Sequence, residues 1–406
     1  MDNKQDLTNN YGRPVENDTS SLTIGEFGPT LIIDTQLTQK LAHLDHERIP
    51  ERVAFARGAG AYGVFETTKS MKNYTKADFL QKEGAQTKVF VRFSTFVLSK
   101  GSSEVVRDIR GFHIKFYTNS GNYDLVNIHL PVFYVRDAMK VPDLLHALKP
   151  SPVTNLILPE RTWQYFSKLP ETLNAITYLY GKYGIPANYI QMEGHSVCVY
   201  KWLNEDGDVF YVKYHFLPQK GAAYLTKQQA QEIQKNTSAS ATNNLYSNLS
   251  NKNYPKWDVY VQILEEKNLD TFPFHPLDTT KIWDEKVLPL QKIGTLTLNE
   301  IPDNFFEYSE QVAFDPGSFV AGIEASESKL LQGLMFAYPD ANRYRLGINY
   351  PFLKVNRPLD GIHNYQQNGQ MDIRNQKGEI NFFPNQESNS LKENTSNQYS
   401  EGKYFI

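Results

Sequence analysis

Several segments of the chain alternate apolar side chains with other side chains at a period of two residues, and this alternation constrains the fold more than any other feature. In KVFVRFST, for example, Val89, Val91 and Phe93 share one face of an extended chain. FHIKFYT, DVFYVKYHF and WDVYVQIL repeat the pattern with aromatic and β-branched residues, which favour a sheet with one face in a core. Gly and Asn turns, such as NSGNYD and NEDGDV, separate the strands as hairpin connections do. We therefore expect an antiparallel sheet, either open or closed into a barrel.

Helical patterns lie between these strands, which makes the predicted fold class α+β. Their sequences are VPDLLHALK, PERTWQYFSKL, TLNAITYLYGKYG and TKQQAQEIQKN. We interpret the low-complexity stretch 236–253 as a loop. Residues 267–384 are rich in Pro, Asn and Gly, and an irregular stretch of that length normally wraps over other structure.

Composition and charge argue against several functional classes. Of the 406 residues, 40% are hydrophobic, which is enough for a sizeable core. The formal net charge is −3 with both signs mixed, a balance that favours neither nucleic acid nor an anionic membrane as a partner. No apolar run approaches the ~18 residues of a membrane span, and the polar N-terminus is unlike a signal peptide, so we expect a cytoplasmic protein. The single cysteine, Cys198, rules out an internal disulfide, and its apolar surroundings favour an inert thiol over a nucleophile.

A set of longer motifs resembles the haem catalases, in the same order and at similar spacing, from about residue 23 to residue 384. The motifs are LAHLDHERIPERV, ARGAGAYG, VFVRFST, VVRDIRGFHIKFYT, YGIPANYIQMEG, FAYPDANRYRLGINY and NYQQNGQM. The resemblance implies an eight-stranded antiparallel β-barrel with haem b, an iron porphyrin, buried between the barrel and a wrapping segment. It also implies a homo-oligomer, a tetramer or a dimer, that acts on a small molecule. The helical C-terminal domain of longer family members has no counterpart in the sequence.

Under this resemblance the chain divides into four parts, which we list with their predicted bounds. They are a flexible N-terminal arm at 1–22, a β-barrel domain with inserted helices at 23–266, a wrapping segment with the proximal haem ligand at 267–384, and a polar C-terminal tail at 385–406. The arm and the tail are assigned on their polar composition alone.

The resemblance places the haem-binding residues of the family on four positions that this chain retains. Tyr338 matches the tyrosine that binds the haem iron; catalases are the known case of this ligand, and Fe(III) would hold the phenol as phenolate. Arg52, Arg92 and Arg345 match three arginines that bind the haem propionates, which a planar guanidinium can meet bidentately. Without the resemblance, Tyr338 is a packed core tyrosine and each arginine an ordinary salt-bridge residue. For Arg92, the sequence itself argues against an ordinary salt-bridge residue, because a charge in the middle of an apolar strand needs a partner.

The distal side departs from the pattern of the family. Phe55 stands where the family has its catalytic histidine, and Ile128 stands at the first asparagine of GNNTP, which is NIHLP here. Phe96 replaces a small apolar residue at the inner end of the channel, whereas the pocket phenylalanine is retained as Phe133. His129 is a candidate replacement base, although the register of the family turns it away from the iron and favours a structural role. A pocket lined by these phenylalanines and Ile128 favours organic guests over peroxide and water.

The proximal side is altered as well. Leu334 replaces an arginine that contacts the phenolate in the family, which removes a charge-assisted hydrogen bond worth about 1.5–3 kcal/mol. Of the hydrogen-bond chain behind that arginine, the histidine is retained as His215, whereas Ser328 replaces the aspartate. The NADPH-contacting histidine of the family matches Gln191, which leaves nucleotide binding undecided.

Three functional hypotheses remain open, and whether the chain is an enzyme is itself open. Peroxide disproportionation needs a base that moves a proton, typically worth ~10²–10⁴-fold in rate, and neither Phe55 nor Ile128 can carry one. The favoured hypothesis is therefore a repurposed haem-dependent oxidoreductase or isomerase that acts on a small organic molecule or an organic peroxide. The alternatives are a residual catalase or peroxidase, with protons relayed by water or His129, and a non-enzymatic pseudocatalase that binds haem or another apolar ligand.

Overall fold

The computed structural model describes residues 5–374, 378–385 and 391–394. Internal contacts divide the chain into two units, Met1–Pro50 and Glu51–Ile406. The first unit therefore extends well beyond the arm predicted at 1–22. Most of the polar tail predicted at 385–406 lies outside the described residues.

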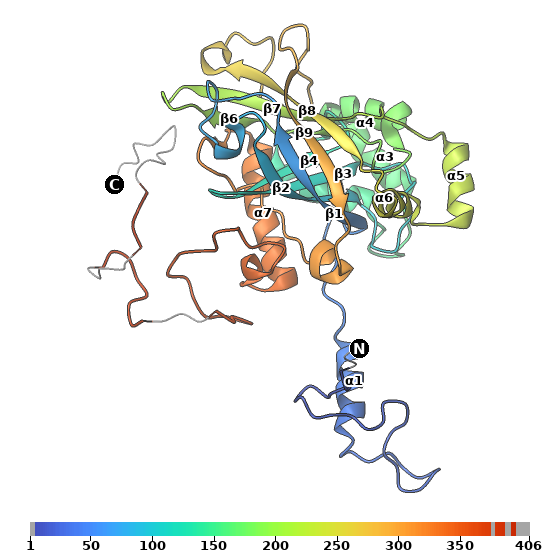
Figure 1. Cartoon of the computed structure of the whole chain (residues 1–406). Helices are drawn as coiled ribbons and strands as arrows, with labels where there is room; N and C mark the ends of the chain where they lie inside the picture. Colours follow the sequence, from blue (N-terminus) through green and yellow to red (C-terminus); the bar gives the residue numbers. More distant parts are fainter. Residues whose placement is uncertain (1–4, 375–377, 386–390, 395–406) are drawn as a thin grey trace. The chain divides into compact units, whose positions relative to one another are not determined.

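The larger unit is built on an antiparallel sheet that closes into a barrel (Figure 1). Its strands in the described residues are β1 (Gly58–Thr67), β2 (Gln86–Thr95), β3 (Arg110–Thr118), β4 (Gly121–Ile128), β5 (Gly194–His195), β6 (Tyr200–Leu203), β7 (Val209–Pro218), β8 (Lys256–Glu265), β9 (Gln291–Glu300) and β10 (Ile323–Ala325). Eight of them form the ring in the order β7-β5-β4-β3-β2-β1-β9-β8, and the pairing of β8 with β7 closes it. β6 and β10 extend the sheet from β7 outside this ring. The expected eight-stranded antiparallel barrel is confirmed.

Helices surround the barrel, and most of them match the sequence patterns. The α-helices in the described residues of the larger unit are α2 (Val141–Leu148), α3 (Pro159–Lys168), α4 (Leu173–Tyr180), α5 (Lys227–Asn236), α6 (Ser240–Ser250) and α7 (Lys329–Leu346). The first unit contains α1 (Thr35–Asp45). The four predicted helices are confirmed as α2 to α5. The loop predicted at 236–253 is wrong, because Ala241, Leu245 and Leu249 recur every four residues and bury one face of α6. Figure 1 shows α3 to α6 gathered on one side of the barrel.

The two longest regular elements of the segment predicted to wrap over the barrel, residues 267–384, were missed by the sequence analysis. β9 pairs with β1 and β8, so the barrel extends past its predicted end at residue 266. α7 has 18 residues and begins at Ser328, whose side chain accepts a hydrogen bond from the amide of Leu331. The high Pro, Asn and Gly content of the whole segment concealed both elements.

Successive side chains of β3 point alternately into the barrel and to its outer face, and this decides which of them reach the outer face. Phe112 and Ile114 point into the barrel core and are fully buried. His113 points to the other face, and the strand register pairs it with Arg92 on β2 and with Val126 on β4. The period of two therefore puts these three side chains on one patch of the outer barrel surface.

Candidate functional site

A cavity of about 360 Å³ lies between the outer face of the barrel and α7. Residues of β2, β3 and β4 line one wall, and residues of α2 and α7 line others. The four side chains predicted for the distal pocket, Phe55, Phe96, Ile128 and Phe133, all line this cavity. Of the described residues that line it, none is acidic, whereas several are arginine or lysine. The site therefore combines apolar walls with positive charge.

Phe55 is held on the distal wall in a rare backbone conformation. Its φ of 62° lies in the left-handed region, which costs a bulky residue about 1–2 kcal/mol. Its amide donates to the carbonyl of Phe96 at 2.7 Å, and its own carbonyl accepts from Nη1 of Arg92 at 2.7 Å. A Cβ at Gly111 would lie 2.9 Å from Cδ1 of Phe55, so glycine is needed there to leave room for the ring. The centroid of this ring lies 5.0 Å from that of Phe96 and 4.7 Å from that of His113.

The phenol of Tyr338 is hydrogen-bonded to His113. Nδ1 of His113 lies 3.1 Å from the carbonyl oxygen of Asn127, so this nitrogen carries the proton and donates. Nε2 is then an acceptor, and the hydroxyl of Tyr338 donates to it at 3.2 Å. Burial, followed by the charge of Arg92, lowers the pKa of His113 to about 3, and burial raises the pKa of Tyr338 above its usual value. Both partners are neutral near pH 7, and their hydrogen bond needs no metal ion.

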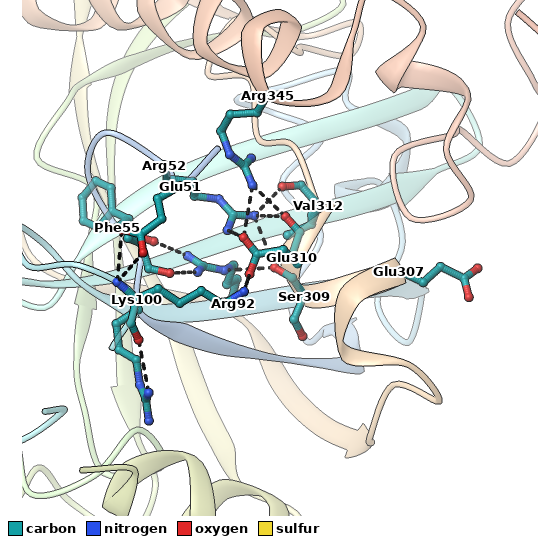
Figure 2. A network of polar contacts seen from close by, with 12 residues as sticks. Glu51, Arg52, Phe55, Arg92, Lys100, Glu307, Ser309, Glu310, Val312 and Arg345 are labelled. Carbon is teal, nitrogen blue, oxygen red and sulfur yellow. Dashed lines mark hydrogen bonds and ion pairs between the residues drawn. The ribbon is translucent and has the colours of Figure 1, made fainter. Parts of the chain in front are cut away.

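Three arginines converge at one end of the cavity, on the π-helical turn Phe306–Glu310 (Figure 2). Nη2 of Arg52 donates to three backbone carbonyls in and just after this turn, at 2.8 to 3.2 Å. Nη2 of Arg345, from α7, donates to the carbonyl of Glu310 at 2.9 Å. Arg92 donates from all three of its nitrogens, to the carbonyls of Phe55, Ala56 and Ser309. We call these three arginines and Glu310 the charged end.

The cations of the charged end outnumber its carboxylate. Oε1 of Glu310 lies 3.4 Å from Arg345 and 3.7 Å from Arg52, and Oε2 lies 2.9 Å from Nζ of Lys100. Burial, and then the charges of Arg92 and Arg345, lower the pKa of Arg52 well below its usual value. Nη1 of Arg52 is buried and makes no hydrogen bond to any described residue. This arrangement attracts an anion, and a carboxylate suits a guanidinium best.

Comparisons with known proteins identify the family. A family model described as Catalase matches residues 8–389. The chain belongs to the catalase family. It is 48% identical over 394 residues to the catalase of Listeria seeligeri, a match that covers 97% of this chain and 81% of that protein. It is 47% identical over 378 residues to Catalase-1 of Arabidopsis thaliana, which covers 93% of this chain and 77% of that one.

Solved structures of the catalase family have the same fold. The structure of a bacterial catalase matches with a TM-score of 0.95 at 36% identity and covers 99% of this chain and 79% of that chain. Catalase A from Saccharomyces cerevisiae matches with a TM-score of 0.95 at 36% identity, over 98% of this chain and 83% of that chain. The barrel and the position of α7 are therefore those of the catalase family.

On the proximal side, the structure brings Leu334 to the cavity but not His215. Leu334 lines the cavity one helical turn before Tyr338. His215 lies elsewhere: its Nδ1 is 2.9 Å from Nδ1 of His195, and its Nε2 donates to Oε1 of Gln262 at 3.0 Å. The proximal role predicted for His215 has no contact in the described residues to support it.

His129 does not line the cavity, and both of its ring nitrogens are engaged. The amide of Arg110 donates to Nδ1 at 2.8 Å, and Nε2 donates to the carbonyl of Tyr183 at 3.0 Å. Burial, then the charge of Arg110, lowers the pKa of His129 to about 3. The structure therefore favours the structural role for His129 over the replacement base.

The side chains present do not fit a haem bound by Tyr338. Non-bonded carbon atoms pack at about 3.5–4.0 Å, so a porphyrin whose iron contacts the phenol oxygen still needs a gap of that width on the face turned to Phe55. His113 leaves no such gap, because it packs against Phe55 on one side and accepts the hydrogen bond of Tyr338, at 3.2 Å, on the other. A porphyrin plane between Phe55 and Tyr338 would pass through the imidazole. The charged end fits carboxylates, but the space in front of the phenol does not fit the ring.

Sequence reasoning missed His113 because its partner, Tyr338, is 225 residues away. One signal was available: in FHIKFYT, the period of two places His113 on the face that also carries Arg92, by antiparallel pairing. In the described part of the chain, no cluster of three or more His, Cys, Asp or Glu residues could hold a metal ion. No helix in that part has the length and apolar character needed to cross a membrane.

Proposed function

We propose that this catalase-family chain does not disproportionate peroxide and that its cavity binds an amphipathic organic acid. The observation that carries the proposal is the direct hydrogen bond between His113 and Tyr338. It occupies the phenol that would otherwise be the iron ligand, and it places a neutral imidazole in the middle of the site. This makes the non-enzymatic alternative of the sequence analysis the best supported of the three.

Peroxide chemistry lacks a proton carrier on the distal wall of this cavity. A catalytic base must accept a proton near neutral pH, and efficiency falls when its pKa is far from the working pH. Phe55 and Ile128 carry no acid or base, and Nε2 of His113 already accepts the hydroxyl of Tyr338. With a pKa of about 3, His113 is also a weak base. Both ring nitrogens of His113 and of His129 are engaged, so neither imidazole can relay a proton. The third histidine near the site, His146, lines the cavity from an exposed position of α2.

The lining of the cavity supports an amphipathic acid as its guest. Phe96, Ile128 and Phe133 present apolar surface, which gains free energy when an apolar chain displaces water. The charged end presents three guanidinium groups around a single glutamate, Glu310. A carboxylate at this end would meet Nη1 of Arg52, which is buried without a hydrogen-bond partner among the described residues.

A second candidate is the haem-dependent protein that the sequence analysis favoured. By the resemblance, Tyr338 and the three arginines match the haem-binding residues of the family, and all four line the cavity, which favours this candidate. In this candidate His113 must leave the space between Phe55 and Tyr338, and the chain then acts on a small organic molecule or an organic peroxide. The cytoplasmic location and the homo-oligomer expected from the sequence remain predictions under either candidate.

Calorimetry with decanoate, and with 1-decanol as the uncharged control, tests the proposed ligand. We expect decanoate to bind and the alcohol to bind at least about tenfold more weakly, because a charge-assisted hydrogen bond is worth about 1.5–3 kcal/mol. Arg345→Gln should weaken decanoate binding by a similar factor. Arg343→Gln, at an exposed position of the same helix, should leave it unchanged.

Oxygen evolution from hydrogen peroxide tests the other half of the proposal. We expect a rate no greater than that of free haemin at equal concentration, with or without added haemin. Turnover well above that level contradicts the loss of disproportionation. Absence of decanoate binding, or equal binding of acid and alcohol, contradicts the proposed ligand.

A further inference from the structure

We propose that His113 is the side chain that excludes an iron porphyrin from this cavity, and that replacing it with a small residue opens the site to haem at Tyr338. The inference rests on the proposed function in treating the cavity as a ligand site. Its test is independent of the organic acid, because it measures porphyrin binding directly.

The exclusion follows from a continuous series of contacts across the cavity. The ring centroid of Phe55 lies 4.7 Å from that of His113, with the rings edge to face. The other side of the imidazole meets Tyr338, with Nε2 at 3.2 Å from the hydroxyl oxygen. A flat macrocycle bound at the phenol needs free space in front of the hydroxyl and a van der Waals gap on its opposite face, and neither contact leaves it.

His113 is fixed in this place from several directions. Its side chain is 4% exposed, and its strand pairs with β2 on one side and β4 on the other, so the backbone cannot shift without breaking the ladder. Nδ1 donates to the carbonyl of Asn127 at 3.1 Å. The ring of Phe314 packs edge to face against the imidazole, at a centroid distance of 5.4 Å. An entering porphyrin would have to break two hydrogen bonds and displace a packed ring.

The rest of the site is ready for a dianionic porphyrin. Tyr338 stands on α7 and lines the cavity, and its hydroxyl donates a hydrogen bond to Nε2 of His113. The charged end offers Arg52 and Arg345 on the side of the cavity where carboxylates would lie (Figure 2). One side chain therefore separates the present arrangement from a haem site, which makes His113 a residue that determines ligand specificity.

The test compares the full-length protein with three variants of the same position. His113→Ala and His113→Ser remove the ring, and the second is included in case the first does not fold. His113→Phe keeps a ring of similar size but cannot accept a hydrogen bond. Each protein is titrated with haemin, bound haem is counted by the pyridine haemochromogen assay, and folding is verified by circular dichroism melting.

We expect His113→Ala and His113→Ser to bind one haemin per chain, at least about tenfold more tightly than the wild-type protein and His113→Phe. In both of the latter a packed ring must be displaced, and in the wild-type protein two hydrogen bonds must also break. Adding Tyr338→Phe to His113→Ala should change the absorption bands that report the iron ligand. One tightly bound haem per wild-type chain overturns the inference. The inference is also overturned if His113→Ala and His113→Ser fold but do not bind haemin. It is overturned as well if His113→Phe binds haemin as tightly as His113→Ala.

Discussion

The charged end and the distal wall of the cavity differ in what holds their side chains. At the charged end, Arg92 donates from every nitrogen to backbone carbonyls, and these join β2 to the segment of Phe55 and to the turn Phe306–Glu310. On the distal wall, the side chains of Phe55 and Ile128 are hydrocarbon and pack without hydrogen bonds. The arginines therefore have a structural reason to persist whatever the cavity binds, whereas the side chains of the wall hold no backbone group in place.

The largest effect is expected where the charged end supports the backbone. Arg92→Met leaves three carbonyls without their donor inside the protein, and we expect the free energy of unfolding to fall by about 3–5 kcal/mol. Urea denaturation followed by circular dichroism measures it. The control is Arg136→Met, whose side chain is 62% exposed and which should cost less than about 1 kcal/mol. If the two variants lost equal stability, Arg92 would not support the backbone at the charged end as we describe.

Glu310 is the next test, because it offsets the repulsion among the cations. Glu310→Gln keeps the shape but removes the charge, and we expect a loss of stability of about 2–3 kcal/mol. Glu307→Gln, in the same turn with a side chain 45% exposed, is the control and should change little. A thermal melt at low and moderate salt measures both. Added decanoate should stabilise Glu310→Gln more than the wild-type protein, because the ligand would replace the missing negative charge. That result would show that the cations of the charged end need an anion.

The pH dependence of stability tests a histidine outside the cavity. The pKa of His129 is lowered to about 3, so its neutral form is favoured by folding. Its contribution is fully present above the unfolded pKa of about 6.5 and is lost as the pH falls from there toward 3, at up to about 1.4 kcal/mol per pH unit. His129→Asn should flatten this part of the stability profile in urea titrations. His363→Asn, at an exposed position, should not.

The smallest effect is expected from the pair in the middle of the cavity. Tyr338→Phe removes one hydrogen bond between neutral partners, and we expect a loss of about 0.5–1.5 kcal/mol. Tyr344→Phe, on the same helix with a side chain 78% exposed, should be neutral. Differential scanning calorimetry of the two variants resolves this difference. A much larger loss in Tyr338→Phe would mean that the phenol has a further partner, such as a metal ion, in solution.

The sequence predicted the barrel and the distal wall but not the centre of the site. The strands β2, β3, β7 and β8 were predictable because the alternation of their side chains is a local pattern. The four residues of the distal wall were predictable from their positions in the family motifs; they are Phe55, Phe96, Ile128 and Phe133. α6 was missed because Ser and Asn dominate its composition, although its buried face repeats every four residues. The contact of His113 with Tyr338 depends on how α7 docks on β3, and no local pattern contains that information.

The haem content of the purified full-length protein, produced with ample iron and haem precursor, tests the central claim most directly. If His113 and Tyr338 are in contact as described, we expect far less than one haem per chain. The Soret band should then be far weaker than that of a protein with one haem per chain. One haem per chain, with a spectrum that changes in Tyr338→Phe, would contradict the account.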